Sequence, residues 1–247
     1  MRSVRTFTME VHFLKCPKCN AKYESIGPTK GVWRCYKCGY DFGEPPFPGM
    51  WVLEKVRGVR CDSCRTKVSL TPMNFLIGFK TPIAACPHCQ KILAVFYRGK
   101  WRHPESFMEY RGREGIIPAK TARDRITAFF LNEEAMREVM SFRMAVGYLN
   151  IKIMWHGGRA VGYYTYSHRF GKIEKPCMQQ IYVRPEYRRR GFATAMVRDF
   201  LESFEGREVL IESPNEKVLR LLEKLGLVRT EGDEYVSTGR IYFVRGL

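Results

Sequence analysis

The stretch VRPEYRRRGFAT, residues 183–194, decides the fold of the second half of this 247-residue chain. It lies between an apolar run and a helical pattern, and it contains three successive arginines followed by Gly191. Backbone N–H groups at the start of a helix, together with the helix dipole, bind anions. Glycine lets a ligand approach the backbone closely. The stretch therefore predicts a diphosphate-binding loop between a strand and a helix.

The sequence on both sides of this loop has an α/β pattern. Apolar residues recur with a helical period from Ala193 to Phe204, which predicts a helix. A second helix is predicted from Asn215, a good N-cap, to Gly226, a good C-cap. A long helix is expected at 132–149. Strands are predicted at 125–131, 151–155, 160–166, 178–183, 209–211, 227–230 and 235–244.

These motifs carry a family resemblance. Arg188-x-x-Gly191-x-Ala193 resembles the Arg/Gln-x-x-Gly-x-Gly/Ala signature of the GNAT superfamily of N-acetyltransferases. The helix that opens at Asn215 and closes with Leu-Gly-Leu at 225–227 is similar to the second element of that family. The resemblance covers roughly residues 120–247. It implies a mixed sheet that splays between the strand ending at Val183 and the next parallel strand, with acetyl-CoA bound in the resulting V.

The resemblance also implies positions for the cofactor. The pantetheine arm would pair with the backbone near Ile181 and Val183, and Asn215 would contact the cofactor. The pyrophosphate would rest on the amides of Arg188, Arg189, Arg190, Gly191, Phe192, Ala193 and Thr194. Transfer of an acetyl group to an amine then needs a base, an oxyanion donor and an acid for the departing thiolate.

Two features depart from the family or leave its chemistry open. Leu222 stands where the family often has a tyrosine acid, and the segment that normally shapes the acceptor site is short. Glu212, at a strand end three residues before Asn215, is the first candidate for the base, with a surface charge as the alternative. Tyr182, on the opposing strand, could orient an acceptor or simply face solvent. The sequence does not identify the acceptor.

Cysteine spacing divides the chain. Eight of the nine cysteines form Cys-x-x-Cys pairs, all before residue 90: Cys16/Cys19, Cys35/Cys38, Cys61/Cys64 and Cys86/Cys89. Two such pairs can surround one zinc ion, and the gaps of 15 and 21 residues within successive couples are typical of zinc ribbons. We expect two zinc ions with the couples joined in sequence order, although crossed pairing also fits the spacing. Disulfides are one alternative to zinc, but they would need an oxidising compartment. A redox-active Cys-x-x-Cys motif is another, but such a motif would normally occur once and not four times.

The charge indicates a polyanionic partner. The chain has 42 Lys and Arg against 25 Asp and Glu, a net charge of +17, and residues 1–104 hold 18 and 6 of these, a net +12. Such an excess of positive charge most often indicates that the protein binds nucleic acid. The alternative is that the charge only keeps the surface soluble. Cations interleaved with aromatics suit phosphate contact and base stacking. The candidates for nucleic-acid contact are Lys18, Arg34 and Lys37, whereas Tyr23 and Trp33 are expected in the core.

The sequence thus predicts an α+β protein. Zinc ribbons are expected at 1–46 and 50–103, a linker at 104–119, and a GNAT-like mixed β-sheet flanked by helices at 120–247. No apolar run approaches the ~18 residues of a membrane helix, and the first residues do not resemble a signal peptide, so we expect no membrane contact and a cytoplasmic location.

The leading interpretation is an acetyl-CoA-dependent N-acetyltransferase that its ribbons direct to nucleic acid, with RNA or a ribonucleoprotein as the favoured partner. An alternative is a non-enzymatic protein that binds RNA or the ribosome through the same ribbons and has a GNAT-like domain. A third interpretation has the ribbons docking another protein.

Overall fold

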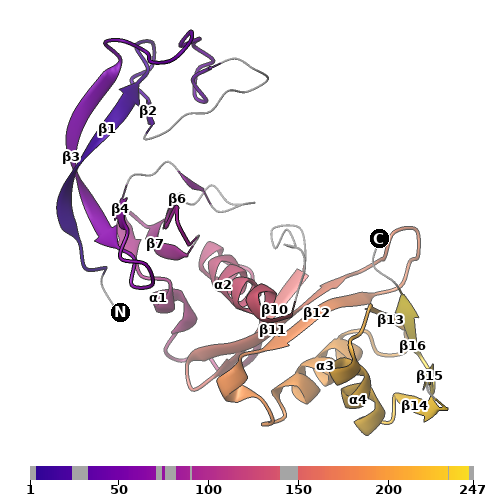
Figure 1. Ribbon diagram of the computed structural model, residues 1–247. Coiled ribbons are helices and arrows are strands. Elements are labelled where there is room, and N and C mark those ends of the chain that lie inside the picture. The colour runs from indigo at the N-terminus through magenta and orange to yellow at the C-terminus, as the bar shows by residue number, and fades with distance from the viewer. Residues whose placement is uncertain are drawn as a thin grey trace. The chain divides into compact units, whose positions relative to one another are not determined.

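The computed structural model describes residues 4–23, 33–70, 74–75, 82–89, 91–139, 150–232 and 234–244. Contacts divide the chain into two units, Met1–Pro104 and Glu105–Leu247 (Figure 1). Within the ranges described, no helix combines the length and the apolar character that crossing a membrane requires.

The first unit contains two antiparallel sheets with the strand orders β2-β1-β3-β4 and β5-β6-β7-β8. The strands are β1 (Phe7–Lys15), β2 (Lys22–Tyr23), β3 (Trp51–Arg60), β4 (Lys67–Ser69), β5 (Asn74–Phe75), β6 (Pro82–Ala85), β7 (Ile92–Tyr97) and β8 (Lys100–Arg102).

The strand that leads into the first cysteine group pairs with the strand that leads into the second. β1 and β3 run antiparallel, from Phe7 opposite Gly58 to Leu14 opposite Trp51, as a twisted ribbon (Figure 1). Cys16 follows β1 and Cys61 follows β3, so the two groups lie at opposite ends of this ribbon. The expected ribbons at 1–46 and 50–103 therefore share one sheet. Both strands alternate between exposed and half-buried residues, and pairing joins the half-buried positions into one face.

A six-stranded mixed sheet forms the centre of the second unit, with the order β16-β13-β12-β11-β10-β9. β13 is parallel to β12 and β16, and the other neighbours are antiparallel. The strands are β9 (Gly115–Pro118), β10 (Asn150–His156), β11 (Arg159–Ser167), β12 (Cys177–Val183), β13 (Val209–Glu212) and β16 (Ile241–Val244), with a separate hairpin of β14 (Val228–Glu231) and β15 (Glu234–Ser237).

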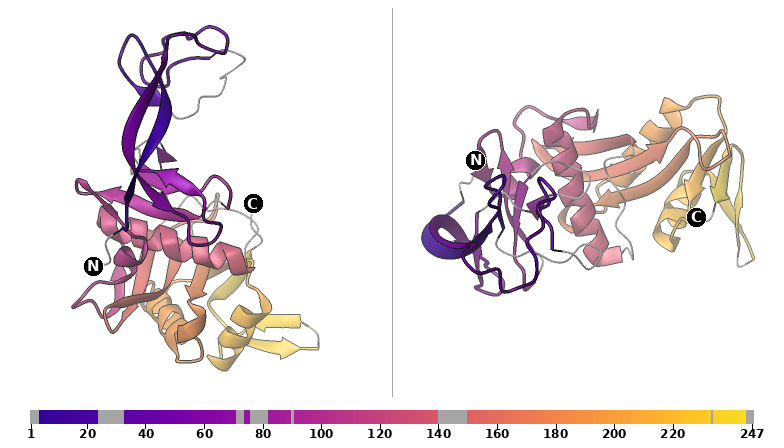
Figure 2. Two further views of the ribbon diagram at one scale, coloured as in Figure 1. Left: turned by 60° about the vertical axis from the view of Figure 1, so that its left-hand side comes forward. Right: turned by 90° about the horizontal axis from the view of Figure 1, so that it is seen from above.

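Helices flank this sheet as the sequence predicts. α2 covers one face, and α3 and α4 cover the other (Figures 1 and 2). The helices are α1 (Glu105–Met108), α2 (Ala122–Val139), η1 (Pro185–Tyr187, a 3-10 turn), α3 (Phe192–Ser203) and α4 (Glu216–Lys224).

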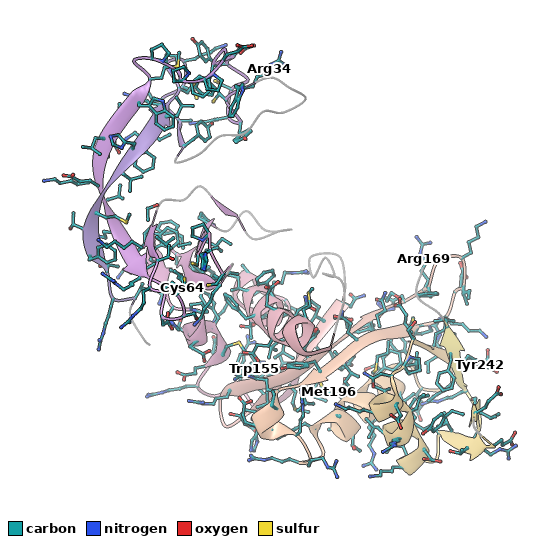
Figure 3. The ribbon with its side chains drawn as sticks, viewed as in Figure 1. Arg34, Cys64, Trp155, Arg169, Met196 and Tyr242 are labelled. Carbon is teal, nitrogen blue, oxygen red and sulfur yellow. The ribbon has the colours of Figure 1, made fainter. Side chains whose placement is uncertain are left out.

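The main core lies between α3 and the sheet. Met196, labelled in Figure 3, and Phe200 are fully buried there. The Phe200 ring lies 6.2 Å from the ring of Tyr164 on β11. Gly162 permits this approach. A Cβ atom at Gly162 would collide with the carbonyl oxygen of Tyr182 and would lie 3.3 Å from Met196 Cε. The glycine therefore lets β12 and α3 pack closely against β11.

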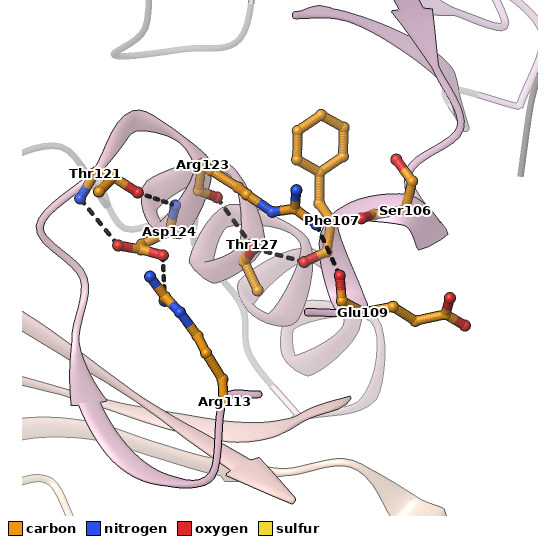
Figure 4. A network of polar contacts seen from close by, with 8 residues as sticks. All are labelled: Ser106, Phe107, Glu109, Arg113, Thr121, Arg123, Asp124 and Thr127. Atoms are coloured by element: carbon orange, nitrogen blue, oxygen red, sulfur yellow. Dashed lines mark hydrogen bonds and ion pairs between the residues drawn. The ribbon is translucent and has the colours of Figure 1, made fainter. Parts of the chain in front are cut away.

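The strand predicted at 125–131 is wrong, because these residues belong to α2. Residues 126–131 are all buried, so the run has no exposed face and does not show a helical period. A cap starts the helix: Asp124 N–H donates to Thr121 Oγ1 (3.2 Å), and Thr121 N–H donates to Asp124 Oδ2 (3.0 Å) (Figure 4). This reciprocal pair is a capping box. The pattern Thr-x-x-Asp at 121–124 is the sequence signal that could have located the helix.

The linker expected at 104–119 is also wrong, because it contains α1 and β9. β9 pairs with β10 at the edge of the sheet, and Phe107 is buried. Side chains of α2 hold the end of α1: Thr127 Oγ1 donates to Phe107 O (2.8 Å), and Arg123 Nη2 donates to Ser106 O (2.8 Å) and Glu109 O (2.7 Å) (Figure 4). The Gly, Arg and Glu content suggested a linker, but these long-range contacts order the segment.

Two further element boundaries differ from the sequence prediction. The run at 235–244 forms two strands, because the chain turns between Ser237 and Ile241 and then joins β13 as β16. Thr238 Oγ1 stabilises this turn by donating to Gly226 O (2.7 Å). The helix expected at 132–149 is the second half of α2 up to Val139, and its positions 140–149 lie outside the described residues.

Candidate functional site

β12 and β13 pair over only two residues each, at the start of β12 and in the middle of β13. Cys177 lies opposite Leu210 and Met178 opposite Ile211, whereas β12 continues to Val183 without a β13 partner. β13 ends at Glu212, so the edge of β12 from Gln179 to Val183 has no strand partner, and we call this unpartnered region beside β12 the opening. The sequence analysis placed a V-shaped opening at this position.

The backbone of β12 presents an unpaired edge to this opening. Arg184 N–H donates to Val161 O on β11 (2.9 Å). Because alternate residues of an antiparallel strand direct their backbone groups toward the partner, the backbone groups of Tyr182 face β11 and those of Ile181 and Val183 face the opening. The edge at which a pantetheine arm is expected to pair therefore has no strand partner, but Val183 O there already accepts a hydrogen bond from Arg188 Nε (2.9 Å).

The loop after β12 leads into an α3 N-terminus with free amides. Gly191 is the N-cap residue with a φ of 83°, and no side chain caps the helix. The first helical hydrogen bond joins Ala195 N–H to Gly191 O (2.9 Å). Within the described residues, no hydrogen bond uses the N–H groups of Phe192, Ala193 and Thr194. A Cβ atom at Gly191 would have no atom within 4 Å, so the space around it is open. This arrangement suits an anion.

Arginines surround these amides, and aromatic rings orient two of them. The Arg188 guanidinium lies 5.7 Å from the ring of Tyr182, and that of Arg190 lies 5.6 Å from the ring of Tyr187. The side chains of Arg188, Arg189 and Arg190 are exposed, and Arg189 adopts a left-handed backbone conformation with a φ of 64°. The loop therefore concentrates positive charge beside the free N–H groups.

A contact that the sequence analysis missed holds the loop to α2. Arg184 Nε and Nη2 donate to the two carboxylate oxygens of Glu134 at 2.9 and 3.2 Å. Burial raises the pKa of the Glu134 carboxyl, and the charge of Arg184 opposes that shift. Charge-assisted bidentate pairs fix geometry as well as energy. Arg184 therefore sets the direction in which the chain leaves β12.

The candidates for catalysis lie on the two walls of the opening. Glu212 ends β13 and is half-buried, and Tyr182 on β12 is buried, with its ring 6.1 Å from that of Tyr163. Tyr182 therefore does not face solvent, which was one of the two expectations for it. Burial, and then the charge of Glu212, raise the pKa of Cys177 to about 12, so this thiol stays protonated at neutral pH. The acidic side chain of Glu212 is thus close to the base of the opening.

α4 follows Glu212 and carries the family's second element. Asn215 Oδ1 accepts a hydrogen bond from Val218 N–H (3.1 Å), so Asn215 caps the helix and leaves its Nδ2 group as the donor that could reach a ligand. Leu222 is fully buried in the core beneath α4. A proton donor is therefore absent at the position where the family often has a tyrosine.

Polar groups on the α2 face of the sheet form a second feature that the sequence did not reveal. The register of β11 and β12 shifts between Thr165 and Tyr166. Near this shift the buried atoms Thr165 Oγ1, Ser167 Oγ and Gln179 Oε1 have no hydrogen-bond partner among the described residues. By contrast, the Tyr163 hydroxyl donates to Asn132 Oδ1 (2.8 Å). Buried polar atoms without partners are few in native proteins, so these three mark a place where a ligand could bond.

The eight paired cysteines form two four-sulfur groups in the first unit: Cys16, Cys19, Cys35 and Cys38 in one, and Cys61, Cys64, Cys86 and Cys89 in the other. The couples are therefore joined in sequence order. Sulfur–sulfur distances are 3.5 and 3.7 Å in the first group and 3.3, 3.5 and 3.9 Å in the second. A tetrahedral zinc site with bonds of about 2.3 Å separates its sulfurs by about 3.8 Å. Both groups fit zinc ribbons.

The surroundings favour the thiolate at Cys35 and Cys64, whereas hydrogen bonds with neighbouring sulfurs raise the pKa of Cys38 and Cys89. Burial raises the pKa of Cys35, but hydrogen bonds from the Tyr23 hydroxyl and from the backbone N–H groups of Cys38 and Lys37 outweigh burial and lower this pKa to about 6. The Thr66 hydroxyl likewise lowers the pKa of Cys64. Thiolates are the form that binds metal.

The structure separates the cations from the aromatics of the first cysteine group. Lys18, Arg34 and Lys37 are exposed, whereas Tyr23 is buried and Trp33 packs on the small core of this group, 5.5 Å from Phe47. The two aromatics are therefore core residues, as expected. The three cations are accessible to a partner.

Comparison with known proteins agrees with this geometry. The sequence model described as "Acetyltransferase (GNAT) family" matches residues 107–227, which include the β12 loop, α3 and α4. This part of the chain is an acetyltransferase domain of the GNAT family.

Individual relatives are distant. Protein FAM169B of Mus musculus is 25% identical over 157 residues, which cover 56% of this chain and 45% of the mouse protein, so the chain spans less than half of that relative. An acetyltransferase from Thermus thermophilus is 15% identical with a TM-score of 0.37, over 50% of this chain and 94% of the other. A ribosomal-protein-alanine N-acetyltransferase from Brucella melitensis biovar Abortus is 16% identical with a TM-score of 0.37, over 51% and 99% of the two chains.

Proposed function

We propose that this protein is an acetyl-CoA-dependent N-acetyltransferase whose zinc-binding first unit directs it to nucleic acid or a ribonucleoprotein. The observation that carries the enzymatic part is the combination of a splayed β12–β13 pair with free amides at the α3 N-terminus. The first holds an extended arm along a strand edge, and the second holds a diphosphate.

Different residues of the chain would have different roles in acetyl transfer. Bound acetyl-CoA would supply the activated acetyl group. The backbone of Ile181 and Val183 would position the pantetheine arm, and the N–H groups from Arg188 to Thr194 would hold the pyrophosphate. Glu212 would accept a proton from the acceptor amine. Tyr182, on the opposite wall, would orient the acceptor.

The polar atoms near the register shift support an acceptor that carries hydrogen-bonding groups besides its amine. Thr165 is fully buried, its hydroxyl oxygen has no partner in the described ranges, and an unpaired buried polar group costs about 1–3 kcal/mol. A polar acceptor would supply the missing bond. A base, a polyamine or a protein amine would each satisfy this requirement.

The first unit would carry two zinc ions and contact nucleic acid. Its formal charge of +12 and the exposed Lys18, Arg34 and Lys37 support this part of the proposal. Two zinc–thiolate sites each add two negative charges, which would leave this segment at about +8. It would therefore remain strongly basic.

A turnover assay tests the enzymatic part. Purified full-length protein with acetyl-CoA should release CoA thiol faster when an RNA, a polyamine or a lysine-containing peptide is added. Binding of acetyl-CoA by calorimetry, measured in parallel, separates a protein that binds the cofactor without turnover from one that does not bind it.

Leu222 favours a second candidate function. With no proton donor at this α4 position, the domain could keep its fold as a non-enzymatic RNA- or ribosome-binding protein. Binding of RNA without any turnover across the acceptor panel would select this alternative. Turnover with any acceptor would exclude it.

A further inference from the structure

An open pocket lies at the second cysteine group of the first unit. It has a volume of about 550 Å³, and its lining residues are Arg5, Thr6, Phe7, Arg60, Asp62 and Arg65. Three strands converge there, because Phe7 of β1 pairs with Gly58 of β3, and Arg60 of β3 pairs with Lys67 of β4. The pocket is distinct from the cations of the first cysteine group.

Within the part of the chain that the structure describes, the arginines of this pocket lack an ion-pair partner. No ion pair among the described residues engages Arg5, Arg60 or Arg65, whereas other cations of the same unit are paired, such as Lys22 with Glu54. Asp62 is the acidic residue of the lining, and Lys91 lies 3.1 Å from its Oδ2 atom. The charge of Asp62 is therefore already balanced by Lys91, and none of the three arginines has an ion-pair partner among the described residues.

Two of these arginines occupy positions at which a cation or a long side chain lowers the stability of the fold. Arg60 and Lys67 are directly opposite each other on neighbouring strands, an arrangement in which like charges destabilise a sheet. Arg65 has a φ of 65°, at the position after the second cysteine of its pair, where the first group has Asn20 and Gly39. Asparagine and glycine tolerate this left-handed conformation, and a long side chain costs about 1–2 kcal/mol there. The Arg60–Lys67 pair and the backbone conformation of Arg65 are thus both unfavourable for stability, and both place a cation at the same pocket.

We propose that this pocket binds a phosphate of single-stranded nucleic acid, with Arg5, Arg60 and Arg65 contacting the phosphate and Phe7 contacting the adjacent base. Arginine forks match phosphate oxygens. Phe7 is half-buried in the lining, and Lys67 Nζ lies 5.9 Å from its ring centroid, so an aromatic face stands among cations. Aromatic rings within a positively charged groove are the features that bind single strands, and they favour nucleic acid over a phosphorylated peptide.

This inference rests on the nucleic-acid part of the proposed function and names a site for it. It assigns the strongest contact to the second cysteine group, in addition to Lys18, Arg34 and Lys37 at the first. The bound phosphate would relieve the repulsion between Arg60 and Lys67.

A matched pair of variants on β3 tests the site. Arg60→Glu and Arg57→Glu make the same change of net charge on two exposed residues of one strand, three positions apart and therefore on opposite faces. Arg65→Asn removes a pocket cation and installs the residue that the first group has at this position. Binding of a fluorescent single-stranded RNA of about 12 nucleotides, a length within the range that such grooves occupy, is measured on the full chain by anisotropy at several salt concentrations. Thermal unfolding is measured in parallel.

We expect Arg60→Glu and Arg65→Asn each to weaken RNA binding about tenfold and to lower the slope of log affinity against log salt by about 0.7, the value for one lost phosphate contact. Arg57→Glu should change affinity less than about threefold, because only long-range charge is altered. The melting temperature of Arg65→Asn should not fall, because asparagine relieves the backbone conformation. Lost binding without lost stability distinguishes a ligand contact from a structural role.

Equal weakening by Arg60→Glu and Arg57→Glu would overturn the pocket while leaving nucleic-acid targeting intact. A wild-type chain that binds no RNA would overturn both the pocket and the nucleic-acid part of the proposed function, and turnover with acetyl-CoA would still report on the enzymatic part. Tight binding of a phosphoserine peptide in place of RNA would also overturn the proposal.

Discussion

Replacing Gly191 by alanine should weaken acetyl-CoA binding by a factor of about 100 or more, whereas the same change at Gly206 should not. The two glycines form a matched pair. Their φ angles are 83° and 74°, and a Cβ atom would meet no atom within 4 Å at either position. Gly191 is the N-cap of α3, and Gly206 follows its far end, so about 18 Å of helix separates them.

The cost in stability should be the same at the two positions. Alanine with a positive φ is disfavoured by about 1–2 kcal/mol relative to glycine, and neither position adds a steric clash. For a unit of this size the melting temperature should fall by a few degrees in both variants, about 2–4 °C per kcal/mol. Thermal unfolding followed by circular dichroism measures this cost.

The effect on binding should differ between them. A methyl group at Gly191 occupies the space beside the free amides of Phe192, Ala193 and Thr194. Loss of two charge-assisted hydrogen bonds, at about 1.5–3 kcal/mol each, weakens binding by a factor of about 100 or more. Gly191→Glu should weaken it further, because its charge repels the pyrophosphate. Isothermal titration calorimetry with acetyl-CoA measures the affinities.

Equal affinities of the Gly191→Ala and Gly206→Ala proteins for acetyl-CoA would refute the assignment of the diphosphate site. Such a result, together with equal losses in melting temperature, would show that Gly191 has only a conformational role. The GNAT fold would then remain, but its cofactor site would lie elsewhere or be lost.

Three other expectations can be tested directly. Metal analysis of the purified protein should give about two zinc ions per chain, and one or none would remove the assignment of at least one ribbon. Thr121→Ala should lower the free energy of unfolding of the second unit by about 1 kcal/mol, because it deletes the α2 cap, and an unchanged melting temperature would contradict the capping role. Glu212→Gln should lower kcat by about 100-fold or more while the affinity for acetyl-CoA stays the same. Full turnover in this variant would make Glu212 a surface charge.

The sequence by itself was sufficient where the signal is local. The two four-cysteine groups are predicted from their Cys-x-x-Cys turns. Each turn is closed by a local backbone hydrogen bond, as when Asn20 N–H donates to Cys16 O (2.9 Å). α3 follows from its apolar period, and α4 from the cap at Asn215. The same local reading located β10 to β13 and the glycine of the loop. Each of these features depends on neighbours within a few residues, so a short stretch of sequence is enough to predict it.

Tertiary contacts alone decided the remaining features. α2 was mistaken for a strand because packing buries all of 126–131, which hides the helical period. α1 and β9 are ordered by side chains of α2 and by pairing with β10, and composition says nothing of either contact. The pairing of β1 with β3 joins segments that are far apart in the sequence. Likewise the opening beyond Met178, and the convergence of Arg5, Arg60 and Arg65 on one pocket, exist only once strand register is set. Register depends on side chains that meet across strands, and no single stretch of sequence contains both partners.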